Sequence, residues 1–177
     1  NCIEERAELA IDLAGSRGGY VYIDNYIPGS EYAPFSSELN FLGNPVPYWY
    51  YVSGNGLIKE QVPSKRDIEM QIERFLDENL ASCNFERLYE DGYSIEIGES
   101  NSRVNIQDNK VDVKVESTIR ASKDEDFSTK DEHRVEVVSK IGKFHSEALD
   151  IYNKQKKEAF LENYTIDVLR LYAPVDG

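Results

Sequence analysis

The spacing of apolar and polar positions along the chain predicts three amphipathic helices. Helical periodicity covers residues 3–14, residues 68–83 and residues 143–172. Ser64 and Asp67, placed after Pro63, form the start signal of the second helix, because a serine cap followed three residues later by an acid satisfies exposed backbone N–H groups. We expect the third helix to be interrupted near Asn163–Thr165.

Between the second and third helices the period of the pattern changes from 3.6 to two. Apolar residues alternate with polar ones around Ile95, Val104, Val113 and Val135. Asp108–Asn109 falls where a tight turn belongs, and the polar stretch 122–130 is expected to link the last two strands. These features predict an antiparallel β-meander of about four strands with one dry face, which the flanking helices must cover. The whole chain, 1–177, is predicted to be a single α+β domain.

A run of four aromatic residues, Tyr48-Trp49-Tyr50-Tyr51, is the most unusual feature of the sequence. Pro45 and Pro47 have no N–H to donate to a ladder, so we expect a Tyr/Trp-rich edge strand here, which lies at the edge of a sheet or outside it. Neighbouring side chains on a strand point to opposite faces, so either Trp49 with Tyr51 or Tyr48 with Tyr50 faces away from the core. The loop 24–44 either folds over that outward pair or leaves it as an interaction surface.

Composition excludes several classes of protein. The chain has 177 residues, is 40% hydrophobic and carries a net charge of −13. No apolar run approaches the roughly 18 residues that a membrane-spanning helix needs. Such an acidic surface repels phosphate backbones, so we expect no nucleic-acid partner.

Two cysteines and one sequon bear on the compartment. Isolated thiols in a cytosolic protein are usually buried and inert, but Cys2 and Cys83 stand at the ends of two predicted helices. We therefore predict that they form a disulfide, which would place the protein in an oxidising compartment. Asn163, in Asn163-Tyr164-Thr165, is a predicted N-glycosylation acceptor and points weakly the same way.

The order of these short motifs resembles a loosely defined group of membrane-anchored archaeal cell-surface proteins. The motifs are Cys2 in the first helix, Gly18-Gly19-Tyr20, the aromatic run, Pro63-Ser64 and Cys83, followed by the meander and the long helix. The resemblance covers most of the chain. It implies an extracytoplasmic position and an N-terminal membrane anchor upstream of Asn1, and it implies no activity.

Candidate chemical sites are weak. The acids Asp124, Glu125 and Asp126, with Asp131 and Glu132, could supply oxygen ligands to a cation, but they lack the EF-hand spacing and are better explained as a solvated loop. The two histidines, His133 and His145, have no partners at zinc-site spacing. We expect no catalytic residues, no cofactor and no metal.

The sequence favours binding over catalysis. We expect an extracytoplasmic binding or structural domain of a cell-surface or appendage protein, acting through a protein partner or self-association. The alternative is an extracellular hydrolase or carbohydrate-active enzyme that uses paired carboxylates, for which abundant acid is the one supporting feature.

Overall fold

The structure is a computed structural model that describes residues 2–23, 37–52, 56, 58–124 and 126–172. In chain order its helices are α1 (Cys2–Ser16), α2 (Lys65–Asn79), the 3-10 helix η1 (Leu80–Ser82), α3 (Glu86–Glu90), α4 (Ile141–Glu158) and α5 (Phe160–Tyr172). Its strands are β1 (Glu38–Phe41), β2 (Asn44–Pro47), β3 (Tyr50–Val52), β4 (Ile58–Glu60), β5 (Ser94–Ile97), β6 (Asn101–Ile106), β7 (Lys110–Lys123) and β8 (Asp126–Val138).

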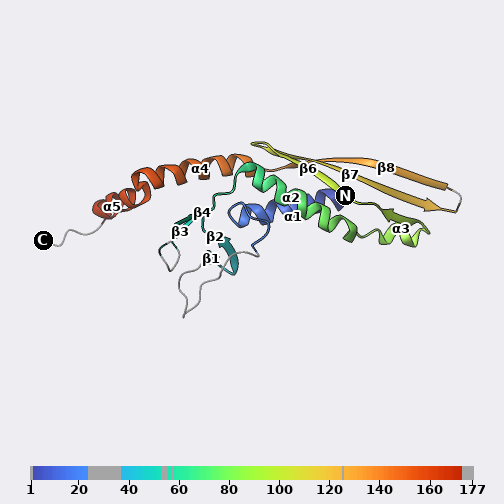
Figure 1. The fold of residues 1–177 in the computed structure, drawn as a ribbon, viewed down its shortest axis with the longest axis horizontal. Helices are drawn as coiled ribbons and strands as arrows, with labels where there is room; N and C mark the ends of the chain where they lie inside the picture. The colour runs from blue at the N-terminus through green and yellow to red at the C-terminus, as the bar shows by residue number, and fades with distance from the viewer. Residues whose placement is uncertain (1, 24–36, 53–55, 57, 125, 173–177) are drawn as a thin grey trace.

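The molecule is elongated and has two distinct parts (Figure 1). The body consists of the four-stranded sheet with α1 and α2 packed on it. The arm, residues 141–172, consists of α4 and α5 and leads away from the body to one end of the molecule, while the β7–β8 hairpin extends toward the other end. Antiparallel sheets and helices that segregate along the chain confirm the predicted α+β class.

The main sheet is a meander whose first strand is interrupted. The long strand β7 lies in the centre and pairs antiparallel with β8 along one edge, and with both β5 and β6 along the other. β5 and β6 therefore follow one another as two segments of a single line. Their junction faces a register shift between Glu116 and Ile119 of β7, and the Gly98 N–H donates to the Thr118 carbonyl there at 2.8 Å.

The predicted alternation of the strands is confirmed. Residues at every second position of β6, and of β7 as far as Ser117, are buried, among them Val104, Val113 and Val115. The turn at Asp108–Asn109 is also confirmed, because it joins the paired ends Ile106 and Val111. The buried face of the sheet is therefore the one that the alternating apolar pattern predicted.

Helices α1 and α2 cover this dry face. Every apolar residue of the predicted α1 stripe is buried: Ile3, Ala7, Ala10, Ile11 and Ala14. In α2, Ile68, Ile72 and Leu76 are at most 1% exposed. Ser64 and Asp67 form the predicted capping box at the start of α2, with the Asp67 N–H donating to the Ser64 hydroxyl at 3.1 Å.

A row of carboxylates on α2 satisfies the outer edge of β6. Glu69, Glu73 and Asp77 accept hydrogen bonds from the backbone N–H groups of Ile106, Val104 and Ser102, at 3.0, 3.0 and 2.9 Å. Four residues along a helix and two residues along a strand cover nearly the same distance, about 6 to 7 Å. Each carboxylate of α2 therefore lies opposite one outward N–H group of β6. An edge strand that would otherwise expose unpaired donors is thereby covered.

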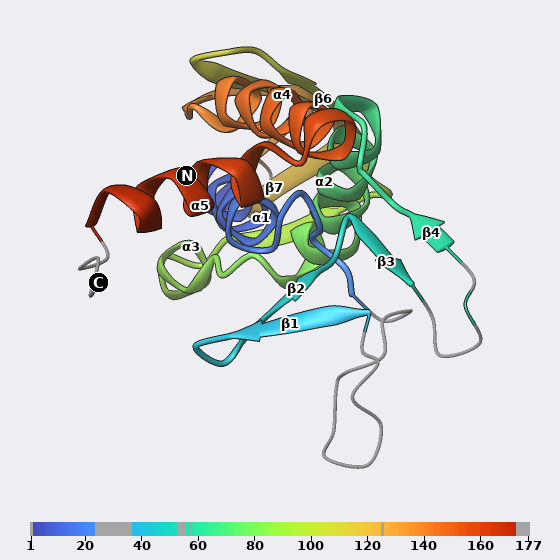
Figure 2. The same ribbon diagram turned by 90° about the vertical axis from the view of Figure 1, so that its left-hand side faces the viewer.

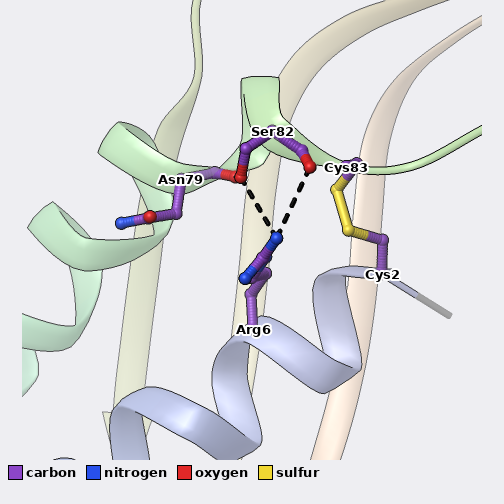
Figure 3. The surroundings of a disulfide bond; sticks show 5 residues. All are labelled: Cys2, Arg6, Asn79, Ser82 and Cys83. Atoms are coloured by element: carbon purple, nitrogen blue, oxygen red, sulfur yellow. Dashed lines mark hydrogen bonds between the residues drawn. A yellow bond between two sulfur atoms is a disulfide. The ribbon is translucent and has the colours of Figure 1, made fainter.

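A disulfide between Cys2 and Cys83 joins the start of α1 to the end of the α2–η1 segment, with Cα atoms 5.9 Å apart (Figure 3). This agrees with the predicted pairing. One turn into α1, the Arg6 guanidinium donates to the Ser82 hydroxyl at 3.1 Å and so adds a second link between the same helix ends. By the chain-entropy model, a bridge across 81 residues is worth about 4 kcal/mol.

Several sequence predictions about local structure are wrong. The stretch 122–130 is not a polar linker: β7 continues to Lys123 and β8 begins at Asp126, because backbone pairing along a long hairpin needs no apolar residues. The described part of the loop 24–44 contains β1, paired with β2. The last helical segment breaks at Ala159, which has a left-handed φ of 46°, instead of near Asn163–Thr165.

The last helical segment also fails to cover the sheet. In α4 only Ile141 and Gly142 are buried, where the helix begins against the turn between β6 and β7. A Cβ atom at position 142 would lie 2.3 Å from the Gln107 carbonyl oxygen, so only glycine permits this approach. Since α1 and α2 already occupy the dry face, the rest of the arm has no sheet surface left to bury.

Candidate interaction surface

The aromatic run is not an edge strand of the main sheet and lies outside it, which is the second of the two predicted positions. Pro47 ends β2, while Tyr50 and Tyr51 belong to β3, and the hairpins β1–β2 and β3–β4 are separate two-stranded sheets (Figure 2). Prolines without N–H groups suit a short hairpin, which lies outside the long ladder of the meander. Tyr48 and Tyr50 are 38% and 44% exposed, whereas Trp49 and Tyr51 are half-buried, so the run divides between two faces as alternation requires.

Trp49 fixes the hairpins and α4 to the body. Its indole N–H donates to the Gly18 carbonyl at 2.8 Å, just after α1. Its ring packs against the rings of His145 and Tyr152 on α4, at centroid distances of 6.3 and 5.7 Å. His145 in turn contacts the Pro63 carbonyl at 2.7 Å. This histidine therefore has a structural position at the base of the arm.

A polar cluster next to Trp49 holds the middle of α4 to β4. The Glu60 carboxylate accepts from the Tyr152 hydroxyl at 2.8 Å and from the Lys156 ammonium at 2.6 Å. The hydrogen bonds from Lys156 and Tyr152 lower the pKa of Glu60. Burial, reinforced by the Glu60 contact, raises the pKa of Tyr152 to about 12, so its hydroxyl remains a donor at every physiological pH.

Exposed Tyr50 connects the aromatic run to the arm. It lines an open hollow of about 550 Å³ together with Tyr152, Gln155, Lys156 and Glu162, which come from both α4 and the start of α5. Gln155 also bridges the break at Ala159, because its side chain accepts from the Leu161 N–H at 2.7 Å and donates to Glu162. The surface is thus continuous from β3 across the helix junction.

The arm presents the largest group of exposed apolar side chains among the described residues. None of the thirteen residues of α5 is buried. Its apolar residues spread over about half of the helix circumference, and those on α4 form a second stripe. The exposed large apolar side chains of the arm are Phe144, Ile151, Leu161, Tyr164, Ile166, Leu169, Leu171 and Tyr172, at 45–82% exposure.

A groove of about 430 Å³ runs along the base of the arm. It lies between the last turns of α1 and the first turns of α4, and Trp49 is among its lining residues. Ile11, Ala14, Phe144 and Ala148 make its walls predominantly apolar. Phe144 is 61% exposed, so the groove opens directly onto the apolar stripe of α4.

The other candidate residues are not brought together. Of the predicted acidic loop, Glu125 lies outside the described residues, Asp131 accepts from the Thr118 hydroxyl, and Glu132 pairs with Lys114 and Arg134. The His133 ring forms a hydrogen bond within its own strand, with the Lys130 carbonyl at 3.2 Å. No group of three or more His, Cys, Asp or Glu side chains is arranged to hold a metal among the described residues.

The pair of carboxylates that resembles a catalytic pair is explained by its role at the edge of the sheet. Among the described residues, Asp77 is the acid whose pKa burial raises, with Glu73 nearby, which is the combination that a paired-carboxylate enzyme would show. Both carboxylates, however, bind the backbone of β6, and Glu73 also accepts two hydrogen bonds from Arg66, at 2.9 and 3.0 Å. These contacts assign the pair to the sheet edge.

Asn163, the predicted glycosylation acceptor, is exposed on α5, where its side-chain amide donates to the Glu158 carbonyl at 2.9 Å.

No protein-family model matches this sequence, and searches of curated proteins and of solved structures find no match either. Within the described ranges, no helix combines the length and the apolar character required to cross a bilayer.

Sequence reasoning missed the exposed apolar face of the arm. The pattern in 143–172 was interpreted as a further covering helix. The sequence did contain an indication of this. A meander has one dry face, and the two amphipathic helices that precede it are enough to cover that face, so a third apolar stripe has no site on the sheet.

Proposed function

We propose that this chain is an extracytoplasmic binding or structural domain of a cell-surface or appendage protein, and that it acts by protein–protein contact through the arm and the adjacent exposed tyrosines. The observation that carries the proposal is the state of α5. It is a thirteen-residue helix, half apolar around its circumference, with no buried residue.

Such a helix gains little stability from its own backbone. Isolated helices shorter than about 12–15 residues are marginal in water, and most helical stability comes from packing an apolar face. Exposed apolar patches of this extent on a folded protein mark interaction sites. A partner that covers α5 would supply the missing burial.

The composition of α5 favours a protein over a membrane surface as the partner. Helices that lie on membranes are rich in Lys and Arg on their polar side. The polar side of α5 instead carries Glu162 and Asp167 beside Arg170, and Asp167 lies 3.7 Å from that arginine. Tyrosine is also enriched in protein interfaces, and Tyr50, Tyr164 and Tyr172 border the proposed contact.

The extracytoplasmic location rests on the disulfide. Cys2 and Cys83 are both in the bridge and no free cysteine accompanies it in the described residues. A bond of this kind persists in oxidising compartments. Thiol titration of the denatured, unreduced protein taken from its native compartment should detect no thiol, and two titratable thiols would remove the argument for location.

The contact itself is tested by photo-crosslinking in the intact cell envelope. Tyr164, 61% exposed on the apolar side of α5, is replaced by photoreactive benzoylphenylalanine, and Arg170 on the polar side of the same helix is the matched control. We expect covalent protein adducts from position 164 and few from position 170. Adducts with lipid alone, or equal protein adducts from both positions, would contradict the proposal.

A further inference from the structure

The charges of the molecule are divided unequally between its two parts. The arm contains five basic residues (Lys143, Lys154, Lys156, Lys157, Arg170) and five acidic ones (Glu147, Asp150, Glu158, Glu162, Asp167), so its net charge is zero. The whole charge of −13 therefore lies outside the arm. Two copies of this chain repel one another through their bodies, but not through their arms.

One side of α4 carries an apolar stripe with a charged row next to it. Phe144, Ala148 and Ile151 follow one another at spacings of four and three residues, so they share one side of the helix. The adjacent row is Lys143, Glu147, Lys154 and Glu158. In the described residues, Lys143 lies 3.8 Å from Glu147, Glu158 lies 3.9 Å from Lys157, and the Lys154 ammonium lies 4.4 Å from the centre of the Phe160 ring. Exposed contacts of this kind are weak, so a better-placed partner can displace them.

The order of charges in that row is self-complementary when the helix is reversed. In an antiparallel pair of α4 helices centred near Ile151, Glu147 of one copy faces Lys154 of the other, and Lys143 faces Glu158. The two-fold axis repeats both contacts. In an antiparallel pair of identical helices, the residues that flank the apolar stripe on one side meet the same residues of the other copy. All four pairings therefore join opposite charges.

We infer that the occupant of the arm is a second copy of this chain, with the two α4 helices antiparallel about a two-fold axis close to Ile151. This inference rests on the proposed function and names its partner. Residue 141 of one copy then lies opposite residue 160 of the other, where α5 begins, which brings each α5 toward the apolar groove between α1 and α4 of its neighbour.

The size of the exposed surface fits such a pair. Eight large apolar side chains of the arm are 45–82% exposed. Their combined area is comparable to the ~800 Å² that each partner contributes to a standard interface. Because the arm points away from the body (Figure 1), arm-to-arm contact also leaves the two acidic bodies toward opposite ends of the assembly.

Sedimentation velocity of the disulfide-intact protein across the micromolar range is the test. We expect a concentration-dependent monomer–dimer equilibrium. Ile151→Glu should abolish the dimer because it places two like charges at the axis. The matched control Asn153→Glu adds the same charge off the apolar stripe and should dimerise like the wild type, while circular dichroism checks that both variants are folded.

Charge reversal distinguishes this geometry from unspecific association. Glu147→Lys and Lys154→Glu should each weaken the dimer, by about tenfold, since each converts two symmetry-related exposed attractions into repulsions. The double variant should recover the wild-type dimer. A wild-type monomer throughout the range, a dimer that survives Ile151→Glu, or a double variant weaker than both single variants would overturn the inference.

The two proposals fail separately. If the wild type is monomeric but Tyr164 crosslinks to another protein in the envelope, the second copy is the wrong partner and the arm remains a binding surface. If the protein is monomeric and position 164 gives no protein adduct, the proposed function fails as well.

Discussion

Helices α2 and α5 are similar in length and both are amphipathic, yet the protein uses them in opposite ways. In α2 the apolar stripe is at most 1% exposed at Ile68, Ile72 and Leu76, and even its acids bond to the neighbouring strand. In α5 none of the residues is buried, and Leu171 and Tyr172 are 79% and 82% exposed.

The difference lies in what each helix meets. A meander has one dry face, and α1 and α2 fill it. The arm departs from the sheet at Gly142, and α4 is then held by Trp49, by Glu60 and by the contact of His145 with the Pro63 carbonyl. The same kind of sequence pattern thus stabilises the fold in the body and remains available for association in the arm.

The largest expected contrast is between a charge placed in the body and one placed in the arm. Val113→Asp, at a position 2% exposed, buries an unpaired carboxylate and should cost more than about 4 kcal/mol of unfolding free energy. Leu169→Asp, at a position 59% exposed, should change it by no more than about 0.5 kcal/mol in the monomer. Urea unfolding measures both, and similar losses would show that α5 belongs to the core.

The next contrast concerns the bridge between α1 and η1. Replacement of Cys2 and Cys83 by serine together should lower the unfolding free energy by about 4 kcal/mol, because the unfolded chain regains the freedom of an 81-residue loop. The bridge lies in the body, so association through the arm should persist wherever the variant is folded. A loss below about 1 kcal/mol would contradict the chain-entropy account of this bridge.

Much of the body could be predicted from the sequence, because local periodicity determines which residues become buried there. The α1 stripe, the Ser64–Asp67 cap and the alternation around Val113 all depend on spacing within one element. The carboxylate row of α2 could not be predicted, since it requires the register of Glu73 against Val104, which only the tertiary fold sets.

The candidate surface was less predictable for the same reason. The sequence indicated that one alternate pair of Tyr48–Tyr51 faces outward, and Tyr48 with Tyr50 is that pair. It did not indicate that Trp49 anchors α4, or that α5 is left exposed, because both depend on how much apolar surface other elements have already covered.

Two aspartates of α2 should respond to pH in opposite directions. Burial raises the pKa of Asp77, so stability contributed at this site falls as pH rises from the ordinary value of 3.8 through the folded-state value. Hydrogen bonds from the Ser64 hydroxyl and N–H lower the pKa of Asp67, so its contribution is present above 3.8 and is lost as pH falls through the folded-state value.

Replacing each aspartate by asparagine tests this difference in pH dependence. Asp77→Asn should be neutral or stabilising at neutral pH and lose any gain toward pH 3.8, whereas Asp67→Asn should be destabilising at neutral pH and approach the wild type in acid. Urea unfolding across this range checks both trends, and parallel pH profiles for the two variants would contradict the assignment of the buried and capping roles.

The contrast between α2 and α5 is measured most directly by amide hydrogen exchange at two protein concentrations. At a concentration where the chain is monomeric, α2 amides should exchange near the global unfolding limit, while α5 amides exchange orders of magnitude faster. At a concentration where the chain associates, α5 should become protected and α2 should remain unchanged. The proposal that the arm is an interaction surface would be contradicted by either of two results: α5 protected as strongly as α2 in the monomer, or no change in the exchange of α5 on association.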